Sequence, residues 1–254
     1  MSDGFACLDG VLLPIGQAAI PVDDPAITVG HAVFDTLRSG PDHTVVRLQD
    51  HLERLQLSAA AVGISMPDLE VLAGEVNLVA SRMPGPARIR ITLTGGGRRV
   101  VAATPLDTSR IGRDVRACRG THTDEPYLGG ATKHGSRAPW IVAVQRSGVD
   151  EVLMVDADGR FTEGTTCAVV GIIDGTLYTA AHDGRILAST TLNALLTRAK
   201  SLGIDVVRKG PPAQGPWDGL YVASTTRKLA PVVELDGVPI PSWDPVGRRL
   251  ADGF

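Results

Sequence analysis

Two segments in the first half of the chain carry apolar residues at the spacing of an amphipathic helix. In the first segment, Leu52, Leu55 and Ala59 repeat at i, i+3 and i+7, so they share one helical face. Asp50 and Glu53 near its start have the spacing of a capping box. The pattern therefore predicts a helix that begins near this pair and turns its apolar face inward.

The second helical segment, residues 69–83, leads into a strand. The Pro-Gly-Pro sequence that follows breaks the helix, and residues 87–94 then alternate strictly between apolar and polar positions. Successive side chains of a strand point to opposite faces. Arg88, Arg90 and Thr92 are therefore expected to share one face of this strand.

In the second half, short apolar segments separated by turns replace the helical spacing. Such segments flank Asp-Gly pairs at 158–159 and 174–175, a combination typical of β-hairpins. Residues 191–202 return to helical spacing, and residues 219–223 form a last strand-like run. This half is predicted to be rich in strands.

The change of pattern predicts an α+β fold of two domains. Residues 1–112 are assigned to an N-terminal α/β domain and residues 124–254 to a C-terminal strand-rich domain. The polar stretch at 113–123 is the best candidate for the linker between them. An Asp9-Gly10 turn interrupts the strand-like residues 6–13 at the start of the first domain.

Composition and charge narrow the classes of partner. The chain has 254 residues, 43% of them hydrophobic, and can bury a substantial core. Its formal net charge of −3 gives no overall field for nucleic acid or an acidic membrane, so neither is expected as a partner. The three cysteines lie far apart, which favours a reducing cytoplasm and indicates no zinc or other metal site. The longest apolar run, residues 167–173, is too short to cross a bilayer, so a soluble cytoplasmic protein is predicted.

Four separated parts of the chain carry residues that could bind a ligand or take part in a reaction. Each is short, and each would be weak evidence alone. They are GHAVFDTLR at 30–38 with HLERL at 51–55, TKHGSR at 132–137, DADGRFTEG at 156–164, and the pair ILASTT at 186–191 and YVASTT at 221–226.

In this order and spacing the four parts resemble the class IV aminotransferases, which include branched-chain aminotransferases, D-amino acid aminotransferases and aminodeoxychorismate lyase. The resemblance extends from about residue 29 to residue 237. It implies fold type IV, the cofactor pyridoxal 5'-phosphate, and an active site in the interdomain cleft. It also implies a homodimer in which the second subunit completes the site.

The same resemblance assigns roles to Lys133 and Glu163. Lys133 would be the catalytic lysine that joins the cofactor and later moves a proton. Glu163 would hold the cofactor's ring nitrogen in its protonated form. The alternatives are an exposed surface lysine and a solvated turn glutamate.

The cofactor phosphate needs hydrogen-bond donors and positive charge. Arg54 would supply a guanidinium, although it could instead be a solvated helix arginine. Free amides at the start of the predicted helix near residue 191 favour an anion, although the same residues could simply cap the helix. The expected hydroxyl-bearing contacts are Ser189, Thr190, Thr191, Ser224 and Thr225.

Substrate carboxylates also need cations. Arg88 and Arg90 are the candidate clamp, although two arginines on one face also suit an exposed edge strand. Phe34 and Arg38 are further candidates for substrate contact. The histidines at 31, 51 and 134 are expected to make local hydrogen bonds rather than to catalyse.

Three reactions are compatible with these residues. The first is transamination from an amino donor to a 2-keto acid, with D-amino acids and (R)-primary amines as favoured donors, because residues 222–237 look like those of D-amino acid aminotransferases. The second is an aminodeoxychorismate lyase that releases pyruvate and forms 4-aminobenzoate, suggested by the lysine, histidine and arginine of residues 133–137. The third is a catalytically silent protein that only binds the cofactor.

Overall fold

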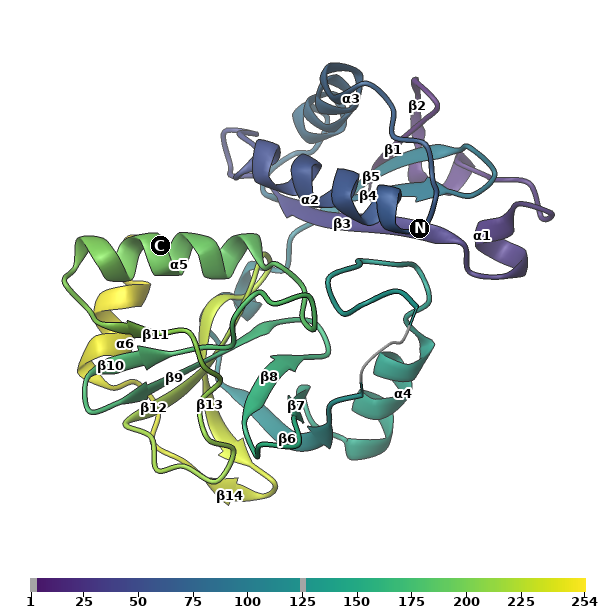
Figure 1. The fold of residues 1–254 in the computed structure, drawn as a ribbon. Helices are drawn as coiled ribbons and strands as arrows, with labels where there is room; N and C mark the ends of the chain where they lie inside the picture. Colours follow the sequence, from purple (N-terminus) through teal and green to yellow (C-terminus); the bar gives the residue numbers. More distant parts are fainter. Residues whose placement is uncertain (1–3, 124–126) are drawn as a thin grey trace. The chain divides into compact units, whose positions relative to one another are not determined.

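The computed structural model describes residues 4–123 and 127–254, and its contacts divide the chain into two compact units (Figure 1). The first unit holds the described residues up to Thr108 together with Thr132–Arg137. The second unit holds the described parts of Ser109–Ala131 and of Ala138–Phe254. Among the described residues, no helix combines the length and the apolar character needed to span a membrane.

The first unit is built on a five-stranded antiparallel sheet with the strand order β2-β1-β5-β4-β3. The strand predicted at 87–94 is confirmed as β4. The strand-like stretch near the N-terminus forms a hairpin that turns at Asp9 and Gly10. The strands are β1 (Phe5–Leu8), β2 (Val11–Pro14), β3 (Ala32–Arg38), β4 (Ala87–Thr94) and β5 (Arg99–Pro105).

Two amphipathic helices, α2 (Leu48–Ala61) and α3 (Leu69–Ser81), cover one face of this sheet (Figure 1). Their apolar residues bury the inward side chains of the strands in one core, which is the pattern expected when a helix stripe meets a sheet face. Two short helices complete the unit, a 3-10 helix (Ile15–Gln17) and α1 (Pro25–Thr28).

The predicted capping box at the start of α2 is wrong. Helix α2 begins at Leu48, directly after Arg47, whose backbone is left-handed with φ of 54°. Asp50 therefore lies in the first turn, where its negative charge interacts favourably with the helix dipole. Glu53 accepts a hydrogen bond from Gln49 at 3.0 Å. Pattern alone misplaced the start because the left-handed residue carries no sequence signature of its own.

The segment Thr132–Arg137 completes the first unit although it comes from far along the chain. The amide of Phe34 donates to the carbonyl of Lys133 at 3.0 Å, and Val33 forms an antiparallel bridge with His134. The structure thus differs from the assignment of this lysine to a domain at 124–254. Its segment extends along the outer edge of β3 because that edge supplies its backbone hydrogen bonds.

The second unit contains a nine-stranded sheet with the order β11-β10-β9-β12-β13-β6-β7-β8, and β14 pairs with β13. A further pairing between β8 and β9, at Glu163 and Ala168, closes six of these strands into a ring. The strands are β6 (Val115–Thr121), β7 (Glu151–Val155), β8 (Phe161–Gly164), β9 (Ala168–Ile173), β10 (Thr176–Tyr178), β11 (Val206–Val207), β12 (Gly219–Ser224), β13 (Lys228–Leu235) and β14 (Val238–Pro239).

The stretch at 113–123, predicted as a linker, instead contains strand β6, which pairs in parallel with both β13 and β7. Val115 and Ala117 point into the core, while Arg116 between them is exposed. The polar composition that suggested a linker therefore belongs to the outward residues of a strand. Both hairpins predicted around the Asp-Gly pairs are confirmed, as β7 with β8 and β9 with β10.

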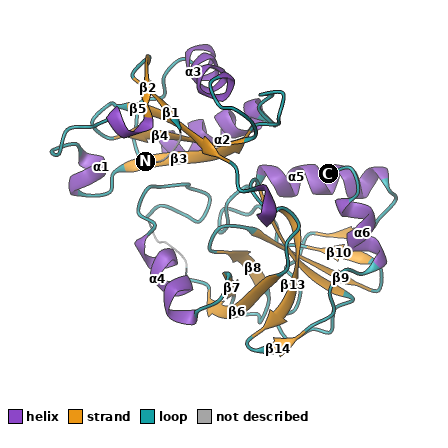
Figure 2. Cartoon of the chain, turned by 180° about the vertical axis from the view of Figure 1, so that it is seen from behind, coloured by secondary structure: helices purple, strands orange, loops and turns teal. Residues whose placement is uncertain are grey.

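Helices α5 (Thr190–Ser201) and α6 (Pro245–Ala251) lie beside each other next to β9 and β10 (Figure 1 and Figure 2). Their apolar residues share a core with the outward residues of the ring, whereas the inward residues form a separate core. The predicted helix at 191–202 is confirmed as α5. The remaining helices are α4 (Ala138–Ser147) and a 3-10 helix at Thr108–Arg110.

Candidate active site

Lys133 is held in the first unit by hydrogen bonds to its backbone. Its carbonyl accepts from the amide of Phe34, and its amide donates to the hydroxyl of Ser58 on α2 at 3.1 Å. Its Nζ lies 4.9 Å from the centroid of the Phe34 ring, and the residue is half-buried. The backbone is thus fixed at both sides, and the alternative of a fully exposed surface lysine does not hold.

Arg54 is buried and paired, so it is not a solvated helix arginine. Its Nε and Nη2 donate to the two carboxylate oxygens of Asp35 at 2.8 and 2.7 Å, the fork geometry that guanidinium and carboxylate favour. The Nδ1 of His51 lies 2.8 Å from the same carboxylate. The local hydrogen-bonding role expected for His51 is confirmed.

The environment of Asp35 keeps its carboxylate charged. Burial raises its pKa, but the charge of Arg54 and the hydrogen bonds from His51 and Arg54 outweigh burial and hold the pKa well below its usual range. The sequence analysis did not select Asp35 as a site residue. The spacing of His51 and Arg54, three residues apart on one helix face, was the available signal that α2 presents two polar side chains to β3.

The opposite face of the same sheet carries the candidate substrate arginines. Strand pairing places Arg38 opposite Arg88 and Thr36 opposite Arg90. Arg90 stacks on Phe34, with its Cζ 3.6 Å from the ring centroid. The predicted common face of Arg88, Arg90 and Thr92 is confirmed. The alternative that these arginines belong to an exposed edge strand is wrong, because β4 lies between β3 and β5.

Two of these arginines have perturbed pKa values. Burial, followed by the neighbouring charges of Arg88 and Arg137, lowers the pKa of Arg90 to about 10. Burial and the charge of Arg47 also lower the pKa of Arg38. Both guanidiniums stay charged at neutral pH, and an anion beside them would favour the charged form and oppose the effect of burial.

Glu163 lies on β8 in the second unit, at the point where the ring of strands closes. Its Oε2 accepts a hydrogen bond from the amide of Leu187 at 3.2 Å, and the residue is half-buried. The alternative of a freely solvated turn glutamate therefore does not hold. A half-buried carboxylate fixed by a backbone amide is suited to pairing with a cationic ring nitrogen.

The start of α5 is a candidate anion site in the same unit. Ser189 is the N-cap and accepts from the amide of Leu192 at 3.2 Å, while Thr190 and Thr191 are buried. The first amides of a helix lack intrahelical partners, and the helix dipole favours negative charge there. The cap and the anion-site interpretations are compatible, because Ser189 accepts from one amide of the first turn while the helix dipole still favours an anion there. Ser224 ends β12, and Thr225 follows it; both are half-buried.

The structure thus brings the candidate residues together in two sets, one in each unit. The first set is Phe34, Arg38, Arg54, Arg88, Arg90 and Lys133, and the second is Glu163, Ser189, Thr190, Thr191, Ser224 and Thr225. These residues fit pyridoxal phosphate, because they include an amine, a fixed carboxylate, a buried guanidinium and the amides of a helix start.

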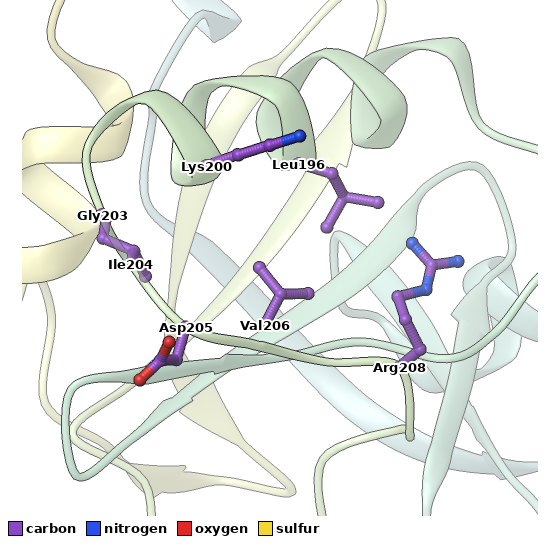
Figure 3. Close-up of a pocket in the computed structure, with 7 residues that line it drawn as sticks. All are labelled: Leu196, Lys200, Gly203, Ile204, Asp205, Val206 and Arg208. Atoms are coloured by element: carbon purple, nitrogen blue, oxygen red, sulfur yellow. The ribbon is translucent and has the colours of Figure 1, made fainter.

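A separate surface pocket lies in the second unit, between the end of α5 and β11 (Figure 3). It combines apolar side chains with two basic side chains and one carboxylate. None of the residues in the two sets lines it. Its lining residues are Leu196, Lys200, Gly203, Ile204, Asp205, Val206 and Arg208.

Comparison with known proteins identifies the relatives of this chain. Residues 32–235 match the family model described as amino-transferase class IV. A putative branched-chain-amino-acid aminotransferase of Methanocaldococcus jannaschii is 27% identical, with 91% of this chain and 87% of that protein covered. A bifunctional aminodeoxychorismate lyase / D-amino acid transaminase of Mycobacterium tuberculosis is 26% identical, with 96% of this chain and 95% of that protein covered.

The structural comparison agrees with the sequence comparison. Two solved forms of a hypothetical aminotransferase from Mycobacterium tuberculosis, one with PLP bound and one with alpha-ketoglutarate and PMP bound, are each 25% identical to this chain. Both have a TM-score of 0.88, with 98% of this chain and 96% of that chain covered.

Proposed function

The chain belongs to the class IV aminotransferases and is a pyridoxal-phosphate-dependent enzyme of fold type IV, and we propose that its preferred amino donors are D-amino acids. The arginine-rich sheet face beside Lys133 supports an amino donor that has a carboxylate, and the activity named for the Mycobacterium tuberculosis relative supports the D-configuration of that donor. Three arginines suit a substrate that presents its carboxylate there, and they are a poor lining for a branched apolar side chain. The D-amino acid transaminase activity named for the Mycobacterium tuberculosis relative is consistent with it.

Lys133 is the residue that moves the proton in this proposal. Bound pyridoxal phosphate withdraws electrons from the bond that breaks at the donor Cα. The Nζ of Lys133 accepts the proton from that Cα, and in the return half-reaction it delivers a proton to the Cα of the new amino acid. Because its backbone is fixed by hydrogen bonds to Phe34 and Ser58, only rotations about the side-chain bonds can move its Nζ.

The other residues bind and orient. Glu163 holds a proton on the ring nitrogen, because a fixed carboxylate stabilises the cationic ring. Arg54 and the start of α5 bind the phosphate, with Ser224 and Thr225 as further hydroxyl donors. Arg90 holds the α-carboxylate of the donor, with Phe34 beneath it as a platform. We further propose a cytoplasmic homodimer.

A donor screen tests the proposal directly. The purified holoenzyme would be incubated with D- and L-amino acids, (R)-primary amines and aminodeoxychorismate while its visible spectrum is recorded. Faster spectral change with D- than with L-amino acids is expected. A clear preference for branched-chain L-amino acids would overturn the donor assignment.

The anchor role of Arg54 predicts weaker cofactor binding in variants of this residue. Arg54→Lys keeps the charge but loses the planar fork, so the Kd for pyridoxal phosphate should rise about tenfold, the equivalent of one charge-assisted hydrogen bond. Arg54→Ala should lose cofactor on dialysis. It should also lower the free energy of unfolding by about 3–5 kcal/mol, because Asp35 stays buried without its guanidinium partner.

Spectroscopic titration of the apoenzyme measures the Kd, and circular dichroism measures folding. Arg98→Ala is the matched control, since it removes an exposed arginine of the same unit. Full cofactor retention by Arg54→Ala with loss of turnover would show that Arg54 does not bind the phosphate.

The role of Arg90 predicts a difference between two classes of donor. A charge-assisted hydrogen bond contributes about 1.5–3 kcal/mol, so Arg90→Ala should lower kcat/KM for D-alanine by roughly ten- to a hundredfold. An (R)-arylalkylamine has no carboxylate and should be nearly unaffected. Loss of cofactor or misfolding would lower both rates together, and equal losses would argue against the carboxylate role.

A second candidate function is the lyase reaction, supported by the other activity named for the Mycobacterium tuberculosis relative. The Lys133 and Arg137 segment, with its histidine between them, also suits it. In that case Lys133 would assist the release of pyruvate from an aromatising ring. Formation of 4-aminobenzoate from aminodeoxychorismate, without any amino transfer to a keto acid, would favour the lyase.

A further inference from the structure

We propose that Arg227 and Glu151 are positioning residues, which hold Glu163 and the turn with Thr225 in the arrangement that the cofactor needs. The inference rests on the proposed function for the contacts of Glu163 and Thr225 with pyridoxal phosphate. Arg227 and Glu151 are called the buried pair below. Neither of them belongs to the two sets of candidate residues.

The sheet of the second unit brings two hairpin turns to the same end. The first turn, residues 165–167, connects β8 with β9 and begins two residues after Glu163. The second turn, residues 225–227, connects β12 with β13. Strands β9 and β12 are hydrogen-bonded neighbours, and Ala168 at the start of β9 lies opposite Ala223 near the end of β12. The two turns therefore lie at neighbouring strand ends.

Glu151 on β7 fixes the first turn. Its carboxylate accepts a hydrogen bond from the hydroxyl of Thr165 and, at 3.1 Å, another from the amide of Thr166. The hydroxyl of Thr166 donates to the other carboxylate oxygen at 2.6 Å. Glu151 is fully buried, and hydrogen bonds in such a low-dielectric environment are stronger than in water. The backbone that follows Glu163 is thus held at two successive residues.

Arg227 joins the second turn to the same carboxylate. It is the last residue of that turn and is buried, and its Nη1 donates to Glu151 at 3.0 Å. Its Nη2 donates to the carbonyl of Asp150 at 3.2 Å, so the guanidinium is fixed at two points. One carboxylate therefore links the backbone beside Glu163 with the backbone beside Thr225.

Stability alone does not explain a charged pair in this place. Removing two charges from water costs free energy, and apolar residues of similar volume are often as stable. The buried pair instead gives directed hydrogen bonds to both turns, which apolar side chains cannot give. We therefore assign its contribution to the relative position of the turns.

Electrostatics also connects the buried pair with Glu163. Burial, followed by the charge of Glu151, raises the pKa of the Cys167 thiol in the first turn. The charge of Glu163 raises the same pKa further, while the charge of Arg227 lowers it. Both carboxylates thus act on one small volume, and Arg227 is the cation that opposes them there.

Spectra and cofactor affinity test the inference without relying on turnover. Hydrogen bonds to the ring nitrogen tune the electronic properties of the cofactor, so its visible absorption reports on Glu163. In the Arg227→Met holoenzyme the visible maximum should shift in the same direction as in Glu163→Gln, and Glu163→Gln/Arg227→Met should shift no further. The Kd for pyridoxal phosphate should also rise about tenfold in Arg227→Met, because the turn with Thr225 loses its fixed position beside the phosphate.

Arg99→Met is the matched control, because it breaks a comparable ion pair with Glu75 in the first unit. It should lower the unfolding temperature and leave the visible maximum and the Kd unchanged. Arg227→Lys should restore the wild-type spectrum in part, since an ammonium can still pair with Glu151. If Arg227→Met does not fold, Glu151→Gln/Arg227→Met leaves no unpaired buried charge and should give the same two changes.

The spectra separate this inference from the proposed role of Glu163. A wild-type spectrum and Kd in Arg227→Met, with an unfolding temperature lowered as in Arg99→Met, would show that the buried pair only stabilises the fold. A shifted spectrum in Glu163→Gln but not in Arg227→Met would overturn this inference alone. An unchanged spectrum in Glu163→Gln would overturn the role of Glu163, and this inference with it.

Discussion

Replacing Lys133 with alanine should reduce amino transfer by roughly a thousandfold or more, the largest loss expected for any single substitution in this chain. General acid–base catalysis by a positioned side chain contributes about 10²–10⁴ in rate, and loss of the covalent attachment adds to this. No other described lysine shares its hydrogen-bonded place along β3. Single-turnover kinetics with D-alanine, followed by absorbance, would measure the loss.

The identity of the lysine can be checked without kinetics. The wild-type holoenzyme should be yellow, and borohydride should attach the cofactor permanently to Lys133, as located by mass spectrometry. Lys200→Ala is the matched control, because Lys200 is exposed on α5 and lines the separate pocket of Figure 3. Attachment to Lys200, Lys209 or Lys228 would contradict the assignment.

Glu163→Gln should retain cofactor but lose roughly ten- to a hundredfold in kcat. A neutral amide cannot stabilise a protonated ring nitrogen as a carboxylate does, and a hydrogen bond to a charged group is worth about 1.5–3 kcal/mol. The side chains are similar in size, so the backbone contact from Leu187 can persist. Steady-state rates, normalised to bound cofactor, would measure the effect.

A matched control separates this effect from a general change of charge in the second unit. Glu234→Gln removes a half-buried glutamate from β13 that is in neither set of candidate residues, and it should leave kcat within about twofold. Unchanged turnover in Glu163→Gln would exclude the proposed role. Loss of cofactor in the same variant would indicate that Glu163 supports binding rather than the reaction.

The contrast between Arg54 and Asp35 shows which part of the site could be predicted from the sequence. The family resemblance and the helix pattern selected Arg54, and its burial agrees with a binding role. Asp35 was not selected, because its partner lies nineteen residues away and the contact forms only when α2 packs on β3. A long-range polar contact of this kind has no periodicity for sequence reasoning to detect.

The domain boundaries show a second limit. Hairpins and helices in the second half were predicted because turn chemistry and periodicity are local. The polar stretch at 113–123 proved to contain β6, where the alternation of Val115, Arg116 and Ala117 is too short to stand out among the polar residues around it. The place of Lys133 depended on backbone hydrogen bonds to β3, which the composition of its own segment does not encode.

The pairing of Thr132–Arg137 with β3 also determines the order in which parts of the first unit can form during synthesis on the ribosome. Nascent chains emerge from the N-terminus at about 5–20 residues per second, and domains tend to fold as they appear. The sheet of the first unit can form once β5 has emerged, but the outer edge of β3 remains uncovered until the segment with Lys133 follows. An uncovered strand edge is a site for wrong pairing between chains. The segment that brings the reactive lysine therefore also covers residues 32–34 of this edge, so the lysine and part of the cover of β3 arrive together during biosynthesis.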